Sequence, residues 1–564
     1  MTRRTIVKEW TLTVVVILLL CITVSPVEKR WADAETDLAL CVMSFLLVGG
    51  MMVLLFRKLV MVTVCDLLVA VWMAYYVVRV MAGGEYPCRT VFLKTVETFL
   101  LYGSLRMLFQ CGKVSEKTLV VGIMIGGCYE ALLGLMQVYD GESRNSRLLM
   151  TGSFLNSGPY AAYLMMGVVI GICCWKEKVM IHATEHKGMA LGLLLMSVVL
   201  LGTGSRAAFI GVAVVALWNY RDRWRRYAIL CAAVLSAISI ALYFLKQGSA
   251  DGRLLIGQAA LASWMRAPWL GVGINGFCHA VADGMENLYV MGRDLSSAGV
   301  TDYSYNVLLK ILVEQGLLGV VFAVAVTVSA LRGLGRCSRS LFYCMVSLLL
   351  FSMFSYPFDL QPYNVLAVMV VAWGESNEGK SLDAVGRKPA MVILCGMVMI
   401  SGCAYRFVKE GKEADRQYEL IRGPGSESLL QDFQDLLPLE EDHVEYMFDY
   451  GKALRVAGRY QDSNAILRQG ARCSADPMFH VLIGNNCKDM GYPAMAERAY
   501  RKAYAVMPNR LYPLYKLMLL YHETGLRMKE RSMAEKILGM KPKVESPATK
   551  EMKEQARKTL LERI

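Results

Sequence analysis

Five charged side chains lie within or beside long apolar runs of this sequence, where charge is costly unless it has a partner. They occur in three stretches: "LGTGSRAAFIGVAV" at 201–214, "DGRLLIGQAALASWMRAPWLGVGINGF" at 251–277 and "DYSYNVLLKILVEQGLLGVV" at 302–321. The five residues are Arg206, Arg253, Arg266, Lys310 and Glu314. Charged groups in a membrane protein usually face a cavity or one another. These five are therefore the first candidates for binding or catalysis.

The arginines bring the chemistry of anion recognition. A guanidinium group is a planar fork that fits a phosphate with two parallel hydrogen bonds. Arg206 is also placed where an arginine at a helix end extends to the lipid headgroups. Arg253 and Arg266 lie on a segment that reads as an amphipathic helix ended by Pro268. A helix of that kind also rests on a bilayer surface without binding a substrate.

Lys310 and Glu314 are four residues apart and share one face of a predicted helix. Glu314 lies about 13 Å along that helix from Tyr305, at about 1.5 Å per residue. A carboxylate at that depth needs an interior partner, and Lys310 is the nearest candidate. Both a structural and a substrate-binding role fit the pair.

A further polar stretch, "GSFLNSGPYAAYL" at 152–164, opens an otherwise apolar segment. Asn156 offers hydrogen bonds there, which suits a turn that lines a substrate groove. The same residues also suit a simple Asn–Ser turn before a helix that begins near Pro159.

The elements that carry these residues are predicted to be membrane helices. The chain has 564 residues, is 55% hydrophobic and only 19% charged, and a bilayer span takes about 20 apolar residues. Thirteen apolar runs qualify: 10–25, 37–56, 59–82, 90–110, 118–138, 158–175, 188–203, 206–219, 227–245, 305–331, 340–356, 361–374 and 390–407. The division at 203–206 is the least distinct. We predict an all-α polytopic membrane protein with about 12–13 spans.

Charge orients these spans. Short basic clusters alternate with neutral loops, as the positive-inside rule requires, so the net charge of +13 indicates membrane orientation and not nucleic-acid binding. The signal-like N-terminus is then an uncleaved first helix. The loop 246–304 and everything after about residue 408 fall outside the cytoplasm. Most of the cysteines lie inside apolar runs and behave as small hydrophobes.

The C-terminal part has a different composition and a repeat. Gly458 recurs at Gly491 and Gly525, and Pro508 recurs at Pro542. These offsets, clearest in residues 484–508, resemble the tetratricopeptide repeat, a pair of helices per unit. We predict a polytopic domain at 1–407 and an extracytoplasmic helical-repeat domain at 408–564. Stacked helix pairs bind peptides or proteins, and they also serve as spacers.

Taken in order, these stretches resemble the O-antigen ligase superfamily, which includes lipopolysaccharide O-antigen ligases, related glycan polymerases and bacterial protein O-oligosaccharyltransferases. The pieces that carry the resemblance are "GSFLNSGPYAAYL", "TGSRAAFIGV", "GRLLIGQAALASWMRAPWLGVGINGF" and "YNVLLKILVEQGLLG", over roughly residues 150–320. Some members also carry a C-terminal helical-repeat tail.

The resemblance implies a reaction and a site. A glycan is moved from undecaprenyl pyrophosphate to an acceptor hydroxyl, with no metal and no other cofactor, at the outer face of the bacterial inner membrane. Arg206 and Arg253 match the family's arginines and are expected to hold the pyrophosphate. The expected catalytic residues are Arg206, Arg253, Tyr305 and Asp302, and the expected substrate-binding residues are Asn156, Arg266, Asn306, Lys310 and Glu314.

One departure from the family concerns the residue that activates the acceptor. Many members have His-Asn where this chain has Tyr305-Asn306, and a tyrosine with a pKa of about 10 is a poor base at neutral pH. Either Tyr305 only positions the acceptor, or another group, such as Asp302, is the base. A weak or absent base also suffices if departure of the leaving group dominates an oxocarbenium-like transition state. A lone histidine in the loop, His279, is more simply explained as solvated.

Other functions remain open at this stage. The acceptor is a lipid A-core sugar, a growing polysaccharide (as in an O-antigen polymerase) or a protein serine or threonine, and the repeat tail favours a protein acceptor or partner. A transporter or flippase for lipid-linked oligosaccharides would have internal duplication and charges along several helices, which the sequence lacks. A membrane-anchored scaffold would leave Arg206 and Arg253 without a purpose.

Overall fold

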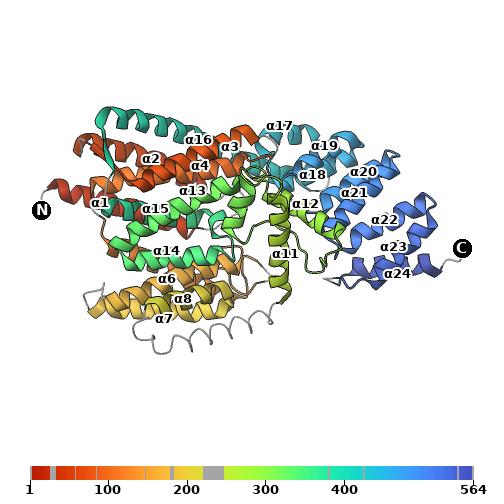
Figure 1. The fold of residues 1–564 in the computed structure, drawn as a ribbon, viewed down its shortest axis with the longest axis horizontal. Helices are drawn as coiled ribbons and strands as arrows, with labels where there is room; N and C mark the ends of the chain where they lie inside the picture. Colours follow the sequence, from red (N-terminus) through yellow and green to blue (C-terminus); the bar gives the residue numbers. More distant parts are fainter. Residues whose placement is uncertain are drawn as a thin grey trace.

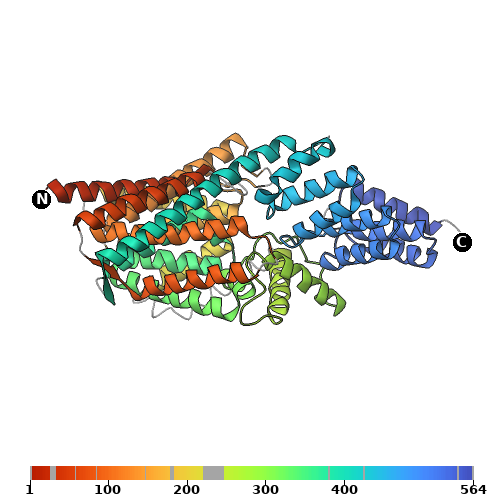
Figure 2. The same ribbon diagram turned by 90° about the horizontal axis from the view of Figure 1, so that it is seen from above.

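The structure is a computed structural model that describes residues 3–25, 33–56, 59–83, 86–112, 114–145, 148–177, 183–219, 247–378, 382–423, 426–542 and 545–561. A bundle of long helices fills one side of the molecule, and shorter paired helices fill the other (Figures 1 and 2). Between them, α11 crosses the end of the bundle at a steep angle to its axis. The N-terminus lies at the far end of the bundle and the C-terminus at the far end of the repeat.

The bundle helices form from the apolar runs. They are α1 (Arg3–Thr23), α2 (Asp33–Phe56), α3 (Val64–Gly83), α4 (Arg89–Cys111), α5 (Glu116–Asp140), α6 (Ser157–Glu177), α7 (Ala183–Thr203), α8 (Arg206–Asn219), α13 (Val307–Cys337), α14 (Arg339–Ser352), α15 (Gln361–Asn377) and α16 (Arg387–Ile421). Every predicted span except 227–245, which lies outside the described residues, coincides with one of them. Among the described residues, six helices are long and apolar enough to cross a membrane, and four shorter apolar helices accompany them. The prediction of an all-α polytopic membrane protein is confirmed.

The bundle core is centred on α6, which is buried throughout from Pro159 to Gly171. Close helix contacts there depend on glycines: a Cβ on Gly126 or Gly134 would come within 2.5 or 2.0 Å of the hydroxyl of Tyr163 or Tyr160. At the end of the bundle far from the repeat, β1 (Leu59–Val62) pairs antiparallel with β2 (Asp383–Gly386). In the part of the chain that the structure describes, this two-stranded ladder is an addition to the predicted all-helical architecture.

Two helices, α11 (Gln247–Trp264) and α12 (Phe277–Val290), belong to the long predicted outside loop. The turn between them inserts into a break in α13. Gly316 interrupts α13 with φ 68° and ψ −168°, the amide of Val272 donates to the carbonyl of Val313 at 2.8 Å, and the amide of Leu317 donates to the carbonyl of Pro268 at 2.9 Å. The backbone groups freed by the break are thus satisfied by the loop, as buried polar groups require.

The C-terminal helices pair as the sequence repeat predicts. A short 3₁₀ turn, η3 (Ser426–Leu429), and α17 (Leu430–Glu440) lead into the pairs α18 (Val444–Val456) with α19 (Tyr460–Gly470), α20 (Met478–Asp489) with α21 (Pro493–Val506), and α22 (Leu511–Glu523) with α23 (Arg527–Gly539), followed by α24 (Pro547–Leu561). The recurring glycines Gly458, Gly491 and Gly525 have φ between 71° and 81°. Each follows the first helix of a pair, where a left-handed residue ends the helix.

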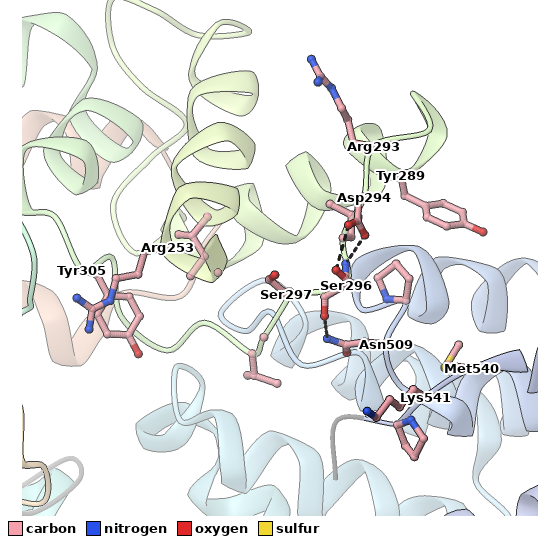
Figure 3. Close-up of a pocket in the computed structure, with 17 residues that line it drawn as sticks. Arg253, Tyr289, Arg293, Asp294, Ser296, Ser297, Tyr305, Asn509, Met540 and Lys541 are labelled. Carbon is pink, nitrogen blue, oxygen red and sulfur yellow. Dashed lines mark hydrogen bonds between the residues drawn. The ribbon is translucent and has the colours of Figure 1, made fainter. Parts of the chain in front are cut away.

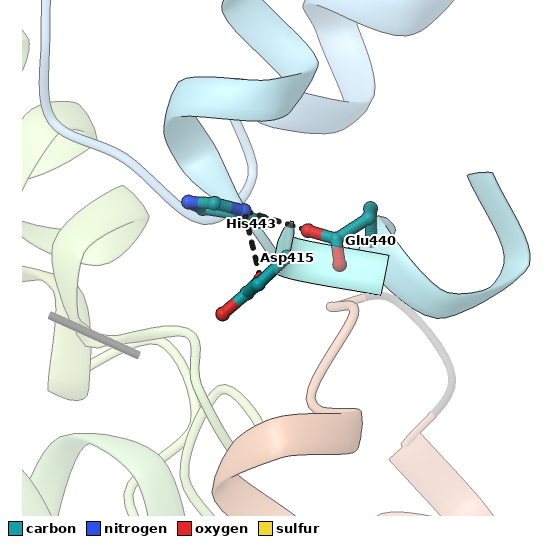
Figure 4. A group of neighbouring side chains, drawn as sticks. All are labelled: Asp415, Glu440 and His443. Carbon is teal, nitrogen blue, oxygen red and sulfur yellow. Dashed lines mark hydrogen bonds and ion pairs between the residues drawn. The ribbon is translucent and has the colours of Figure 1, made fainter. Parts of the chain in front are cut away.

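The helix α16 runs without a break through the predicted boundary at 407/408 and into the repeat. His443, directly before α18, links the two parts: its Nδ1 lies 2.6 Å from Oε2 of the fully buried Glu440 and 3.6 Å from Oδ1 of Asp415 on α16 (Figure 4). A histidine with two carboxylates is also a set of metal-ligating groups. The hydrogen bond pairs Nδ1 of His443 with Oε2 of Glu440.

Candidate functional site

Two of the predicted arginines, Arg206 and Arg253, lie near each other at the end of the bundle that faces the repeat (Figure 1). Arg206 begins α8, two residues after Gly204, whose left-handed φ of 60° separates α7 from α8. Arg253 lies on α11, and the positive charge of Arg206 contributes to lowering its pKa. Desolvation is the larger cause of that lowered pKa, and the nearby tyrosines oppose it. Two guanidinium groups therefore share one electrostatic environment.

Arg253 is held in place by two contacts. One guanidinium nitrogen donates to the backbone carbonyl of Phe354 at 2.8 Å, and the guanidinium carbon lies 4.9 Å from the centre of the Tyr305 ring. A cation over an aromatic face is attracted by the ring quadrupole. These contacts orient the guanidinium plane and leave part of the side chain exposed to the cavity described below.

Tyr305 belongs to a cluster of tyrosine rings. Tyr303 and Tyr356 stack with ring centres 3.9 Å apart, and Tyr305 meets Tyr356 edge-on at 5.6 Å. The backbone of Tyr305 is left-handed, with φ 52°, which is unusual for a bulky side chain. Burial raises the pKa of Tyr305, so its hydroxyl remains protonated at neutral pH.

Asn156 has two contacts in the turn before α6. Its side-chain oxygen accepts from the amide of Gly158 at 3.1 Å, and its side chain is also a hydrogen-bond partner of Tyr356. The preceding residues are fixed to α5, because the carboxylate of Glu130 accepts from the amide and the hydroxyl of Ser153 at 3.0 and 2.6 Å. The turn thus caps a helix and borders the tyrosine cluster at the same time.

Asn306 and Lys310 hold the first turn of α13. The Asn306 side chain accepts from the amide of Leu309 at 3.0 Å and donates to the carbonyl of Met353 at 3.3 Å. Lys310 forms an ion pair with Asp359, in the short 3₁₀ helix η2 (Pro357–Asp359). Both residues therefore join α13 to the loop between α14 and α15.

Glu314 lies one turn further along α13 and contacts the inserted loop. Its carboxylate accepts from the amide of Phe277, the first residue of α12, at 3.4 Å. The backbone carbonyl of Glu314 accepts a hydrogen bond from the amide of Gly273 at 3.2 Å. The positive charge of Lys310 acts on the Glu314 carboxylate, but the direct ion-pair partner of Lys310 is Asp359. These contacts give Glu314 a structural role.

The remaining predicted residues lie apart from the arginine pair or at its edge. Asp302 is exposed and close enough to influence the pKa of Tyr305. Arg266 is exposed beyond the C-terminal end of α11, about 20 Å from Arg253 along the helix axis.

His279 is not a solvated loop residue: it lies on α12, 3.0 Å from the carbonyl of Ala471 and 3.5 Å from the carboxylate of Asp283.

A cavity of about 1100 Å³ opens beside Arg253 and Tyr305. Its other wall comes from the repeat, with Asn509 between α21 and α22 and Lys541 after α23 (Figure 3). The Asn509 side chain donates to the carbonyls of Ser296 and Ala298 at 2.9 and 2.7 Å. This clamp fixes the loop after α12 against the repeat.

Sequence reasoning missed Tyr303, Tyr356 and Asp359, and it missed the part that the repeat plays in the cavity. The signal for two of them was the polar stretch "SYPFDLQP" at 355–362, which interrupts two apolar runs. Nothing in the repeat sequence indicates which of its turns face the bundle.

Comparison with known proteins gives a family match for part of the chain. Residues 191–324, which include α8, α11, α12 and the first part of α13, match the sequence profile described as O-antigen ligase. Asn156 lies outside this match. No curated protein matches the chain. The crystal structure of MamA protein is similar at 17% identity, over 27% of this chain and 88% of MamA, with a TM-score of 0.22, and no conclusion about this chain follows from a likeness at that score.

Proposed function

Because residues 191–324 form an O-antigen ligase family domain, which supports a membrane glycosyltransferase role, we propose that the protein transfers a glycan from undecaprenyl pyrophosphate to an acceptor hydroxyl. In this proposal the reaction takes place at the extracytoplasmic face of the bacterial inner membrane. The domain boundaries at 1–407 and 408–564 belong to the proposal, with the repeat domain on the periplasmic side.

In the proposed reaction, the acceptor oxygen bonds to the anomeric carbon of the glycan as the bond from that carbon to the pyrophosphate oxygen breaks. The electron pair of the broken bond stays on the pyrophosphate, which leaves with its lipid. The acceptor loses its proton to a carboxylate. Negative charge grows on the leaving oxygen, so fixed positive charges beside it stabilise the transition state more than the ground state.

The residues take separate roles. Arg206 and Arg253 bind the pyrophosphate and stabilise its developing charge. Tyr305 orients Arg253 through its ring, and its raised pKa makes it a hydrogen-bond donor to the acceptor and not a base. Asp302, exposed beside Tyr305, is the proposed proton acceptor. Because the two guanidinium groups supply the positive charge, the proposal includes no metal requirement.

The observation that carries the proposal is the geometry around Arg253, whose guanidinium group is held by the carbonyl of Phe354 at 2.8 Å and by the Tyr305 ring at 4.9 Å beside a cavity. Arg206, 47 positions earlier in the chain, lies close enough for its charge to contribute to lowering the pKa of Arg253. Like charges brought together in a desolvated site indicate a site for an anion between them. A lipid diphosphate fits, because the helices beside the site offer apolar surface for its tail.

Transfer in a defined membrane tests the proposal. The full-length protein in lipid nanodiscs is supplied with an undecaprenyl-pyrophosphate glycan and, separately, a lipid A-core acceptor, a polysaccharide acceptor and a serine-containing peptide. Glycan transfer to one of them is expected with and without EDTA. Arg206→Lys keeps the charge but loses the two-pronged hydrogen bonding, and it should lower kcat about 100-fold.

The matched control is Arg557→Lys on the exposed face of α24, which should leave transfer unchanged. Movement of the lipid-linked glycan across the membrane without transfer would support a flippase instead. Transfer that is insensitive to both Arg206→Lys and Arg253→Lys would remove the proposed mechanism.

A further inference from the structure

The cavity beside Arg253 is built from two parts of the chain that are far apart in sequence. Arg253 and Ile256 line it from α11, Tyr305 from the start of α13, and Pro508, Met540 and Lys541 from the repeat. Figure 3 shows Arg253 and Tyr305 on one side and Lys541 on the other. A ligand in this cavity would contact the repeat and the candidate catalytic arginine together.

The walls of the cavity are fixed in place. Besides the Asn509 clamp, Lys502 on α21 lies 3.3 Å from Asp283 and 3.6 Å from Glu286, both on α12. The carboxylate of Asp294 accepts from the amide and the hydroxyl of Ser296 at 2.9 and 3.1 Å, which stabilises the turn. A prearranged wall lowers the cost of ordering on binding.

The lining combines apolar side chains with positive charge. Ile256, Leu295, Val300, Met540 and two prolines supply apolar surface, and the lining includes three basic residues, Arg253, Arg293 and Lys541, and one acidic residue, Asp294. Asp294 is already engaged with Ser296. The ligand that complements this surface has apolar side chains and carboxylates. A polypeptide offers both, whereas a neutral glycan would leave the cations and the aliphatic groups unmatched.

We propose that this cavity binds an acidic segment of a polypeptide, whose serine or threonine hydroxyl is brought to Arg253 and Tyr305, with the repeat forming half of the binding surface. This inference rests on the proposed function and adds the acceptor class to it. Lys541 is then a specificity-determining residue that selects carboxylates near the hydroxyl. The volume of about 1100 Å³ exceeds the usual range for small-ligand pockets, as a segment of polymer requires.

Direct peptide binding tests the inference without the donor. The probes are fluorescent peptides of about ten residues with one serine between aspartates and apolar residues, the same peptide with asparagines, and the same peptide with lysines. Fluorescence anisotropy measures their affinity for the full-length protein in nanodiscs. The aspartate peptide should bind at least about fivefold more tightly than the asparagine peptide, with the difference shrinking at high salt.

Two variants distinguish peptide binding in this cavity from attraction to the general surface charge of the protein. Lys541→Glu should lower the affinity for the aspartate peptide and raise the affinity for the lysine peptide. Such a reversal cannot come from misfolding. Lys550→Glu, an equal charge change at an exposed position of α24, should change neither affinity. Equal affinity for all three peptides, or equal effects of the two variants, would overturn the inference.

Transfer assays keep the two proposals distinct. Glycan transfer to a lipid A-core sugar with no peptide binding would overturn the polypeptide inference and leave the proposed function intact. Peptide binding that depends on Lys541, with no transfer to any acceptor, would overturn the proposed function and leave the peptide site intact. With both correct, Lys541→Glu raises KM for the aspartate peptide while kcat at saturation changes little.

Discussion

Tyr305 is the residue at which backbone strain and the candidate chemistry coincide. Its φ of 52° costs about 1–3 kcal/mol for a side chain of this kind, and the surrounding rings and Arg253 hold it there. Strain of this kind persists where the structure requires one orientation of a side chain. Here it aims the Tyr305 ring at the guanidinium group of Arg253.

The proton acceptor can be identified by comparing two substitutions. Asp302→Asn removes the carboxylate that we propose takes the acceptor proton, and kcat should fall by about 10²–10⁴. Tyr305→Phe keeps the ring over Arg253 and loses only the hydroxyl, so its loss should be smaller than that of Asp302→Asn. Steady-state transfer kinetics on the two variants measure this, and the opposite order would assign the proton transfer to Tyr305.

The sequence predicted the charged residues better than it predicted their partners. Arg206 was identified because charge is rare in apolar runs, and Arg253 because it matches an arginine of the family that the sequence resembles. The ion pair of Lys310 with Asp359 was not, because helix spacing reports only neighbours on the same helix. Arg266 was grouped with Arg253 by proximity in the chain, and the length of α11 places it elsewhere.

The break in α13 is the element that positions the site. Gly316 has φ 68°, and a Cβ there would lie 2.3 Å from the carbonyl oxygen of Trp269. Glycine is therefore required both by the backbone conformation and by the close approach of the inserted loop. The break allows residues 268–273 to dock, and docking fixes both α11 and the start of α12.

Gly316→Ala should therefore destabilise the protein by at least about 1–3 kcal/mol and increase hydrogen exchange in residues 265–277. The control is Gly257→Ala on α11, where no neighbouring atom lies within 4 Å of the new Cβ. That substitution should stabilise the helix by about 0.5–1 kcal/mol. Similar exchange in both variants would mean that the inserted loop does not depend on the break.

Regular elements were predictable, and this inserted loop was not. Apolar runs fixed the bundle helices, and the glycine spacing fixed the repeat pairs, because both are local patterns. The pairing of 268–273 with 313–317 joins segments more than 40 residues apart. The helix α12 was hidden within a loop of mixed composition, because its apolar residues pack on α11 while several of its polar residues contact the repeat.

At the scale of the whole molecule, the repeat is held to the bundle by polar contacts. Thr90 at the start of α4 donates through its amide and hydroxyl to the carboxylate of Asp442 at 2.6 and 3.0 Å. Arg89 donates to the carbonyl of Pro438 at 2.8 Å. Together with the contacts of α12 and Asn509, these bonds make the repeat part of the site.

The region where α20 and α21 meet α12 is sensitive to pH through His480 on α20. Burial, with the positive charges of Lys502 and His279, lowers the pKa of His480 on α20 to about 4, against about 6.5 when unfolded. Between these values the unfolded state binds more protons, so the stability of this region is complete above pH 6.5 and falls as the pH drops toward 4.

Hydrogen exchange of residues 478–506, corrected for intrinsic rates, should therefore increase from pH 7 to 4.5. His480→Gln should flatten this dependence, and His186→Gln, on α7 in the bundle, should not. An unchanged profile in His480→Gln would mean that other groups control the docking of the repeat.

The central claim is that Arg206 and Arg253 together bind a lipid diphosphate. Binding of undecaprenyl pyrophosphate to the protein in nanodiscs tests this claim most directly. Undecaprenyl pyrophosphate should bind more tightly than undecaprenyl monophosphate. Arg206→Lys and Arg253→Lys should each weaken the binding of the diphosphate lipid at least about tenfold. Arg557→Lys should leave this binding unchanged. Equal affinity for the two lipids, or no loss in either arginine variant, would contradict the account.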